Sequence, residues 1–176
     1  MRCADAAPSG ISRASRKEQL MKRVSTLLSV LLLLCASTAF AKSYIPKKNT
    51  RAAIKSYVRN AAKLVAKSGP SCESFKSKDW MAGDYYVFVT GPDDKLVCHP
   101  NAAMVGKANA DIVDANGKKV GLDLIAAAKK KGGGWVDYVW PRPGQTTPVA
   151  KSSYAMRVKG PDGNWYVVGA GGYELK

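Results

Sequence analysis

The chain has 176 residues, 46% of them hydrophobic, and it carries 28 lysines and arginines against 13 acidic residues, a formal net charge of +15. This length is enough for one domain with a real hydrophobic core. This positive charge favours anionic partners in general. The cations are mostly scattered lysines, and no arginine-rich cluster is interleaved with aromatic residues. This pattern argues against a nucleic-acid-binding protein.

The N-terminal part contains the pattern of a secretory signal peptide. Lys22 and Arg23 precede an apolar run, residues 27–34, and small residues follow in Ala39-Phe40-Ala41. These are the charged, apolar and cleavage regions of a signal peptide. A membrane anchor is the alternative, but the longer apolar stretch from Val24 to Phe40 is short for the roughly 20 residues of a spanning helix.

We therefore expect residues 21–41 to form a signal peptide that is cleaved after Ala41, with residues 1–20 an upstream extension. Residues 42–176 are expected to form a single domain. The expected location is periplasmic or secreted, and the mature protein is not expected to span a membrane.

Two of the four cysteines remain after this cleavage. Cys3 and Cys35 lie before the cleavage site, which leaves Cys72 and Cys98. Since disulfides persist outside the cytoplasm, we expect a Cys72–Cys98 bridge, which closes a loop of about 25 residues and contributes about 3 kcal/mol. The cysteines form no CxxC pair, so neither a redox motif nor a zinc site is expected.

The first half of the mature sequence predicts a helix followed by a hairpin. Asn49 or Thr50 can cap the helix, which ends at Ser68-Gly69-Pro70. Residues 84–90 are aromatic and β-branched, and a turn separates them from a returning strand at residues 95–99. Apolar residues at helical spacing define the buried face of the helix: Ile54, Val58, Ala61, Ala62 and Val65.

The second half predicts one more helix and three more strands. Residues 101–118 are expected to form a loop with a short helical turn, and residues 120–131 a helix that stops at three consecutive glycines. The strands are expected at residues 135–140, 152–158 and 165–169. This order predicts an α+β domain with an antiparallel sheet of about five strands and helices against one face.

Six motifs in chain order resemble the single Cache domain family. They are Tyr85-Tyr86-Val87-Phe88-Val89, Leu96-Val97-Cys98-His99-Pro100-Asn101, Met104-Val105-Gly106-Lys107, Gly134-Trp135-Val136-Asp137-Tyr138-Val139-Trp140-Pro141, Lys151-Ser152-Ser153-Tyr154 and Val167-Val168-Gly169-Ala170-Gly171. The resemblance covers roughly residues 50 to 173.

The resemblance implies a PAS-like antiparallel sheet with a long N-terminal helix and a second helix. It also implies a pocket for small metabolites, often short carboxylates, in extracytoplasmic sensing. Most such domains lie between two transmembrane helices of a chemoreceptor or kinase. This chain ends soon after its last strand, so we expect it to need a membrane-bound receptor or kinase as partner.

Four candidate ligand contacts lie on the expected strands. Strand alternation places Tyr138 and Trp140 on one face, where they can wall a pocket. His99 has no carboxylate or thiolate companion at metal-ligand spacing, and the resemblance implies a ligand contact for it. Tyr86 belongs to the first motif of the resemblance and is included for that reason.

Lys151 and Tyr154 are the candidates for anion recognition, because a cation and a hydroxyl donor are what a buried carboxylate requires. Simple alternation places these two positions on opposite faces. Joint binding therefore requires a bulge in the strand, or a strand that begins after Lys151.

The function expected from the sequence is binding of a small anionic metabolite such as a short carboxylate by an exported sensory domain, without a cofactor. The alternative is a basic, envelope-associated interaction protein that has no small-molecule ligand. An enzyme is not expected, because no nucleophile has a supporting base and the aspartates fall at caps, turns or loops. These are Asp79, Asp84, Asp93, Asp94, Asp111 and Asp114.

Overall fold

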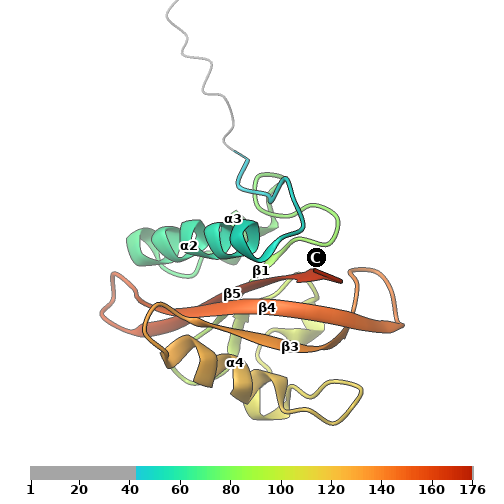
Figure 1. Cartoon of the computed structure of the whole chain (residues 1–176). Helices are drawn as coiled ribbons and strands as arrows, with labels where there is room; N and C mark the ends of the chain where they lie inside the picture. The colour runs from blue at the N-terminus through green and yellow to red at the C-terminus, as the bar shows by residue number, and fades with distance from the viewer. Residues whose placement is uncertain (1–42, 176) are drawn as a thin grey trace, which may run out of the picture. The chain divides into compact units, whose positions relative to one another are not determined.

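The structure is a computed structural model that describes residues 43–175. The expected signal peptide, its cleavage site and the upstream extension lie outside the described residues. The elements in chain order (Figure 1) are α2 (Arg51–Ser68), α3 (Cys72–Lys76), β1 (Val87–Thr90), β2 (Leu96–Cys98), η1 (Ala102–Met104), η2 (Asn109–Asp111), α4 (Val120–Lys129), β3 (Gly134–Pro141), β4 (Pro148–Lys159) and β5 (Trp165–Tyr173).

The five strands form one antiparallel sheet in the order β2-β1-β5-β4-β3. The expectation of an α+β, PAS-like domain with about five antiparallel strands is confirmed. The last strand in the sequence, β5, lies in the centre of the sheet between β1 and β4. The two halves of the chain therefore meet at the sheet centre, and both contribute side chains to each sheet face.

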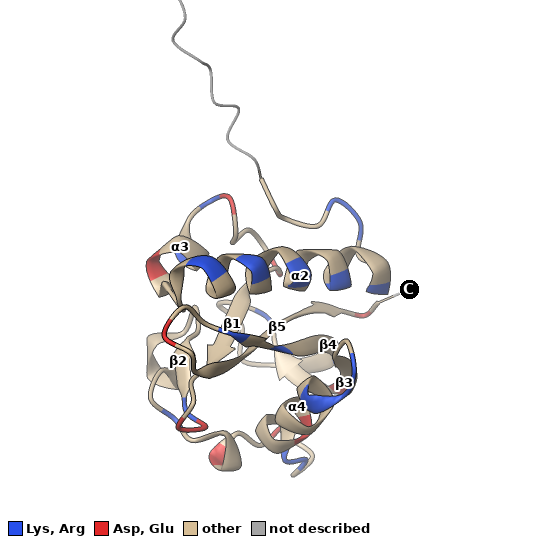
Figure 2. Ribbon diagram, turned by 90° about the vertical axis from the view of Figure 1, so that its left-hand side faces the viewer, with Lys and Arg blue, Asp and Glu red and all other residues tan. Residues whose placement is uncertain are grey.

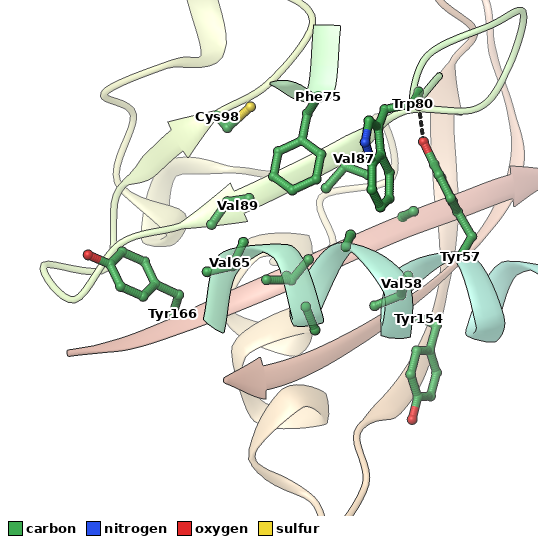
Figure 3. Close-up of a cluster of buried hydrophobic side chains, with 14 of the residues drawn as sticks. Tyr57, Val58, Val65, Phe75, Trp80, Val87, Val89, Cys98, Tyr154 and Tyr166 are labelled. Atoms are coloured by element: carbon green, nitrogen blue, oxygen red, sulfur yellow. Dashed lines mark hydrogen bonds between the residues drawn. The ribbon is translucent and has the colours of Figure 1, made fainter. Parts of the chain in front are cut away.

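Helix α2 begins and ends where the sequence predicts. The Thr50 side chain accepts a hydrogen bond from the Ala53 amide, and Gly69, with φ of 77°, ends the helix. Its apolar stripe lies on one face of the sheet (Figure 3), where Val58 and Val65 are fully buried. Tyr57 extends this core, and its hydroxyl donates to the Trp80 carbonyl oxygen.

Helix α4 covers the other face of the sheet (Figure 1). Its residues Leu124 and Ala128 pack with Phe88 and Ala155, whereas Tyr154 belongs to the core under α2. The expectation that the helices share one face was therefore wrong. Both faces of the sheet are apolar in the strands that form its centre, so each face requires its own helical layer.

Two local differences from the sequence prediction lie between α2 and β2. Residues 72–76 form the short helix α3, whose Phe75 packs edge-on against Trp80 at 5.2 Å between ring centroids. Strand β1 begins at Val87 because the preceding residues form a tight turn, in which the Tyr85 amide donates to the Ala82 carbonyl at 3.0 Å.

The Cys72–Cys98 disulfide is present in the structure, with 5.0 Å between the two Cα atoms. It links the start of α3 to the last residue of β2, and His99 follows directly. Within residues 43–175, none of the helices combines the length and the apolar character that crossing a membrane requires.

Candidate ligand-binding site

The candidate site is a pair of adjoining hollows on the sheet face that carries α4. The outer hollow has a volume of about 490 Å³ and the inner one about 30 Å³. The outer volume is in the usual range for small-molecule sites, and the inner one has room for little more than a water-sized group. Four residues line both hollows: Tyr86, His99, Met104 and Trp140.

The two hollows differ in their other walls. The inner hollow ends on apolar side chains, including Phe88 from β1 and Leu124 from α4. The outer hollow is completed by the loop that connects β3 and β4, which contributes residues 141–146. The inner hollow thus has mainly apolar walls, whereas the outer one combines apolar residues with the polar side chains of Arg142, Gln145 and Thr146.

Lys151 lies at the centre of a tyrosine cluster beside these hollows. It is 2% exposed, and its Nζ donates hydrogen bonds to the hydroxyl oxygens of Tyr86 at 2.5 Å and Tyr173 at 3.3 Å. The same nitrogen is 4.2 Å from the ring centroid of Tyr86 and 4.7 Å from that of Tyr173. Tyr86 lines both hollows, whereas Lys151 lines neither of them.

Sheet register brings this cluster together. Lys151 of β4 is paired with Tyr138 of β3 on one side and with Tyr173 of β5 on the other. A glycine next to them gives the lysine stem its space, since a Cβ atom at Gly171 would lie 2.8 Å from Lys151 Cε. The close approach of stem and strand therefore requires glycine at this position.

Among residues 43–175, no carboxylate lies within ion-pair distance of Lys151. Burial lowers the pKa of Lys151 to about 7, and the charge of Asp84 opposes this change. Among the described residues Lys151 takes part in no ion pair, and its hydrogen-bond acceptors are neutral hydroxyls. A buried cation of this kind is stabilised when an anion binds nearby.

His99, which lines both hollows, presents a hydrogen-bond donor. Its Nδ1 accepts from the Asn101 amide at 3.1 Å, so the neutral ring carries its proton on Nε2. Burial, together with the charge of Lys151, lowers the pKa of His99 to about 4. The ring packs edge-on against Tyr86 at 5.2 Å between centroids. His99 is therefore a neutral donor at ordinary pH.

Arg142 anchors the loop at the mouth of the outer hollow. Its guanidinium forms ion pairs with Asp84 and, at 2.6 Å, with Glu174. It also lies 4.9 Å from the ring centroid of Tyr173, whose hydroxyl donates to the Pro141 carbonyl at 2.7 Å. The loop is thus connected to the lysine cluster through one tyrosine.

Comparison with known proteins places the chain in a family. Residues 12–174 match the single Cache domain 2 family. The chain belongs to this family. The match begins upstream of the expected cleavage site, and it extends to the last residue but two.

Individual relatives of this Cache domain are chemotaxis proteins. The chain is 34% identical, over 91 residues, to the methyl-accepting chemotaxis protein McpP of Pseudomonas putida. This match spans 51% of the chain and only 16% of McpP. A solved periplasmic sensor domain of a chemotaxis protein has 28% identity and a TM-score of 0.50, with 66% of this chain and 85% of that one covered. A Cache chemosensory domain studied for carboxylic acid recognition has 25% identity and a TM-score of 0.46, with 92% and 95% covered.

The structure brings five of the six sequence-predicted ligand residues of this Cache domain together. Tyr86, His99, Tyr138 and Trp140 line the inner hollow. Lys151 lies directly behind Tyr86.

Tyr154 is not part of this group, which corrects the expectation that it acts together with Lys151. Strand β4 runs without interruption from Pro148 to Lys159, so alternation places Tyr154 on the face covered by α2. Its hydroxyl donates to the Gly132 carbonyl oxygen.

Sequence reasoning missed Tyr173 and Arg142. The predicted last strand stopped at Gly169, four residues before Tyr173, because glycines are poor strand formers. If the last strand had been extended and paired in register with the strand of Lys151, Tyr173 would have been predicted to lie opposite Lys151. Among the described residues no group of three or more histidines, cysteines, aspartates or glutamates is arranged to hold a metal ion.

Proposed function

We propose that this Cache domain binds a small carboxylate in the outer hollow, as the sensory part of an extracytoplasmic system. The observation that carries this proposal is the buried ammonium of Lys151, which has only neutral hydroxyl partners and lies one side chain away from the hollow. Burying an unpaired cation is costly, and a ligand carboxylate supplies the missing opposite charge.

The carboxylate is proposed to bind where Tyr86 and His99 meet. One ligand oxygen accepts from the Tyr86 hydroxyl, which itself accepts from Lys151, and the other accepts from His99 Nε2. Trp140 and Met104, which line the outer hollow, contact the hydrocarbon part of the ligand. Hydrogen bonds from two fixed donors give such a ligand its orientation.

Binding without catalysis fits this chemistry better than an enzyme does. His99 has a lowered pKa and is hydrogen-bonded only to a backbone amide among the groups described. No serine, threonine or cysteine hydroxyl or thiol is hydrogen-bonded to it in the described part of the chain. We therefore propose a binding role, with no cofactor.

We propose that the domain acts in the periplasm or outside the cell after cleavage of residues 21–41, together with a membrane-bound receptor or kinase. The charged, apolar and cleavage regions of the N-terminus support export. The receptor nature of McpP supports a sensory role. Intact mass of the exported protein tests the cleavage, and a product that retains residues 27–34 would contradict it.

Calorimetry with carboxylates of two to four carbons, and with the matching neutral amides, tests the binding proposal. The acids should bind and the amides should not. Lys151→Met keeps the length of the stem and removes the charge, so the affinity should fall by a factor of about 30 or more. Lys107→Met, at an exposed position outside the pocket, is the control. Equal affinity in the two variants would refute the proposed site.

A further inference from the structure

Helix α2 carries a cation at every fourth position along its whole length. Figure 2 shows these positions as blue segments at regular intervals along the ribbon of α2. The helix contains no aspartate or glutamate. We call this row the α2 basic row, and its members are Arg51, Lys55, Arg59, Lys63 and Lys67.

The first two members of the row have partners within the domain. Arg51 forms an ion pair with Asp137 at 3.0 Å and lies 4.6 Å from the ring centroid of Trp135. Lys55 is half-buried, with its Nζ 5.3 Å from the ring centroid of Tyr154. These contacts hold the N-terminal end of the row against the body of the domain.

The other three members, Arg59, Lys63 and Lys67, are exposed and form no ion pair among the described residues. Like charges at this spacing repel each other on a helix and destabilise it by a few tenths of a kcal/mol per pair. The helix keeps this repulsion without an acidic side chain to reduce it. An anionic partner along the outer side of α2 would remove the repulsion.

We propose that the α2 basic row docks the domain on an anionic phospholipid surface. The three exposed cations, Arg59, Lys63 and Lys67, span about 12 Å of the helix and turn through about 80° around its axis, so all three can face a flat surface of headgroups. The exposed positions between the cations hold small side chains, such as Ser56 and Ala66. The contact is therefore electrostatic, without insertion of apolar side chains into the bilayer.

Other anionic partners fit this surface less well. Single-stranded nucleic acid binds to aromatic stacking platforms, and a stable protein interface has an apolar core. The outer side of α2 has neither, because its aromatic residue Tyr57 is buried in the core. Binding to a planar surface of phosphate groups requires only the positive charges of the row.

Docking through α2 is compatible with ligand binding. Helix α2 packs on the sheet face opposite α4 (Figure 1), and none of its residues lines the two hollows of the candidate site. The membrane contact and the proposed carboxylate site therefore occupy different faces, and each can be tested without the other.

Co-sedimentation with vesicles tests the docking surface. The probe is phosphatidylcholine vesicles with 30% phosphatidylglycerol, compared with pure phosphatidylcholine. The test variant, Arg59→Gln/Lys63→Gln/Lys67→Gln, keeps good helix formers. The control variant, Lys129→Gln/Lys130→Gln/Lys131→Gln, removes the same charge from three other exposed lysines. Both variants are made in the exported protein.

We expect the wild type to bind anionic vesicles in low salt and to dissociate as the salt concentration rises. At about a factor of five per cation, the test variant should lose about 100-fold in partitioning, and the control less than threefold. Equal losses in both variants, equal binding to neutral vesicles, or binding to duplex DNA but not to vesicles would each overturn the proposal.

Discussion

Lys151 and Tyr173 lie directly opposite each other on β4 and β5, with the lysine Nζ 3.3 Å from the tyrosine hydroxyl and 4.7 Å from its ring centroid. The same ring contacts Arg142, and the same hydroxyl donates to the Pro141 carbonyl. The buried cation and the loop at the mouth of the pocket therefore meet at one tyrosine.

Carboxylate affinity should fall as the pH rises through 7. The pKa of Lys151 is lowered to about 7, so the ammonium that attracts the ligand loses its proton above this pH. Between pH 6 and pH 8 the affinity should fall about tenfold, while the short-chain ligands remain ionised throughout. Calorimetry at several pH values measures this, and the loss should be absent in Lys151→Met.

The stability of the unliganded protein should change in the opposite direction. Because the folded-state pKa of Lys151 is below the usual 10.5, the unfolded chain binds more protons above pH 7. The free energy of unfolding should therefore rise by about 2 kcal/mol between pH 7 and pH 9 relative to Lys151→Met. Urea titrations at the two pH values compare the proteins, and parallel pH profiles would contradict a buried, unpaired lysine.

His99 should titrate with a pKa of about 4, since burial and the Lys151 charge both disfavour its cationic form. The unfolded chain then binds more protons between about pH 4 and 6.5, so the folded state loses up to about 3 kcal/mol as the pH falls through this range. The sequence has one histidine, so its proton NMR signals are unambiguous. A midpoint near 6.5 would show that water reaches the ring.

Gly171→Ala should weaken carboxylate binding. The new Cβ would lie 2.3 Å from Ser153 Oγ, 2.7 Å from the Ser152 carbonyl oxygen and 2.8 Å from Lys151 Cε, so both the β4 strand and the lysine stem must move. A stability loss of about 1–3 kcal/mol is expected from this overpacking. Val65→Ala, in the core under α2, is a destabilised control that leaves the pocket unchanged. Wild-type affinity in Gly171→Ala would contradict the role assigned to Lys151.

Removal of the Cys72–Cys98 bridge should lower the free energy of unfolding by about 3 kcal/mol, because the bridge closes a loop of about 25 residues in the unfolded chain. Cys72→Ala/Cys98→Ala is compared with the wild type in urea, with and without reductant. Reductant should destabilise the wild type and leave the variant unchanged. Equal stability of oxidised and reduced wild type would contradict this prediction.

Much of the fold could be predicted from local patterns in the sequence. Caps and apolar spacing give helix α2 its bounds, and runs of β-branched and aromatic residues between turns indicate all five strands. The five-residue helix α3 is too short for periodicity to reveal it. The sequence also does not say which face each helix covers, because both faces of the central strands are apolar.

The sequence by itself determined the family, the pairing of Cys72 with Cys98 and the residue types that we propose surround a small anion. The family and the residue types follow from local motifs. The cysteine pairing follows because only two cysteines remain after the expected cleavage. Only the tertiary structure decided that Lys151 joins Tyr86 and Tyr173 while Tyr154 lies on the opposite face. The reason is that the face of each side chain depends on whether β4 is continuous, and its neighbours depend on register between strands far apart in the chain.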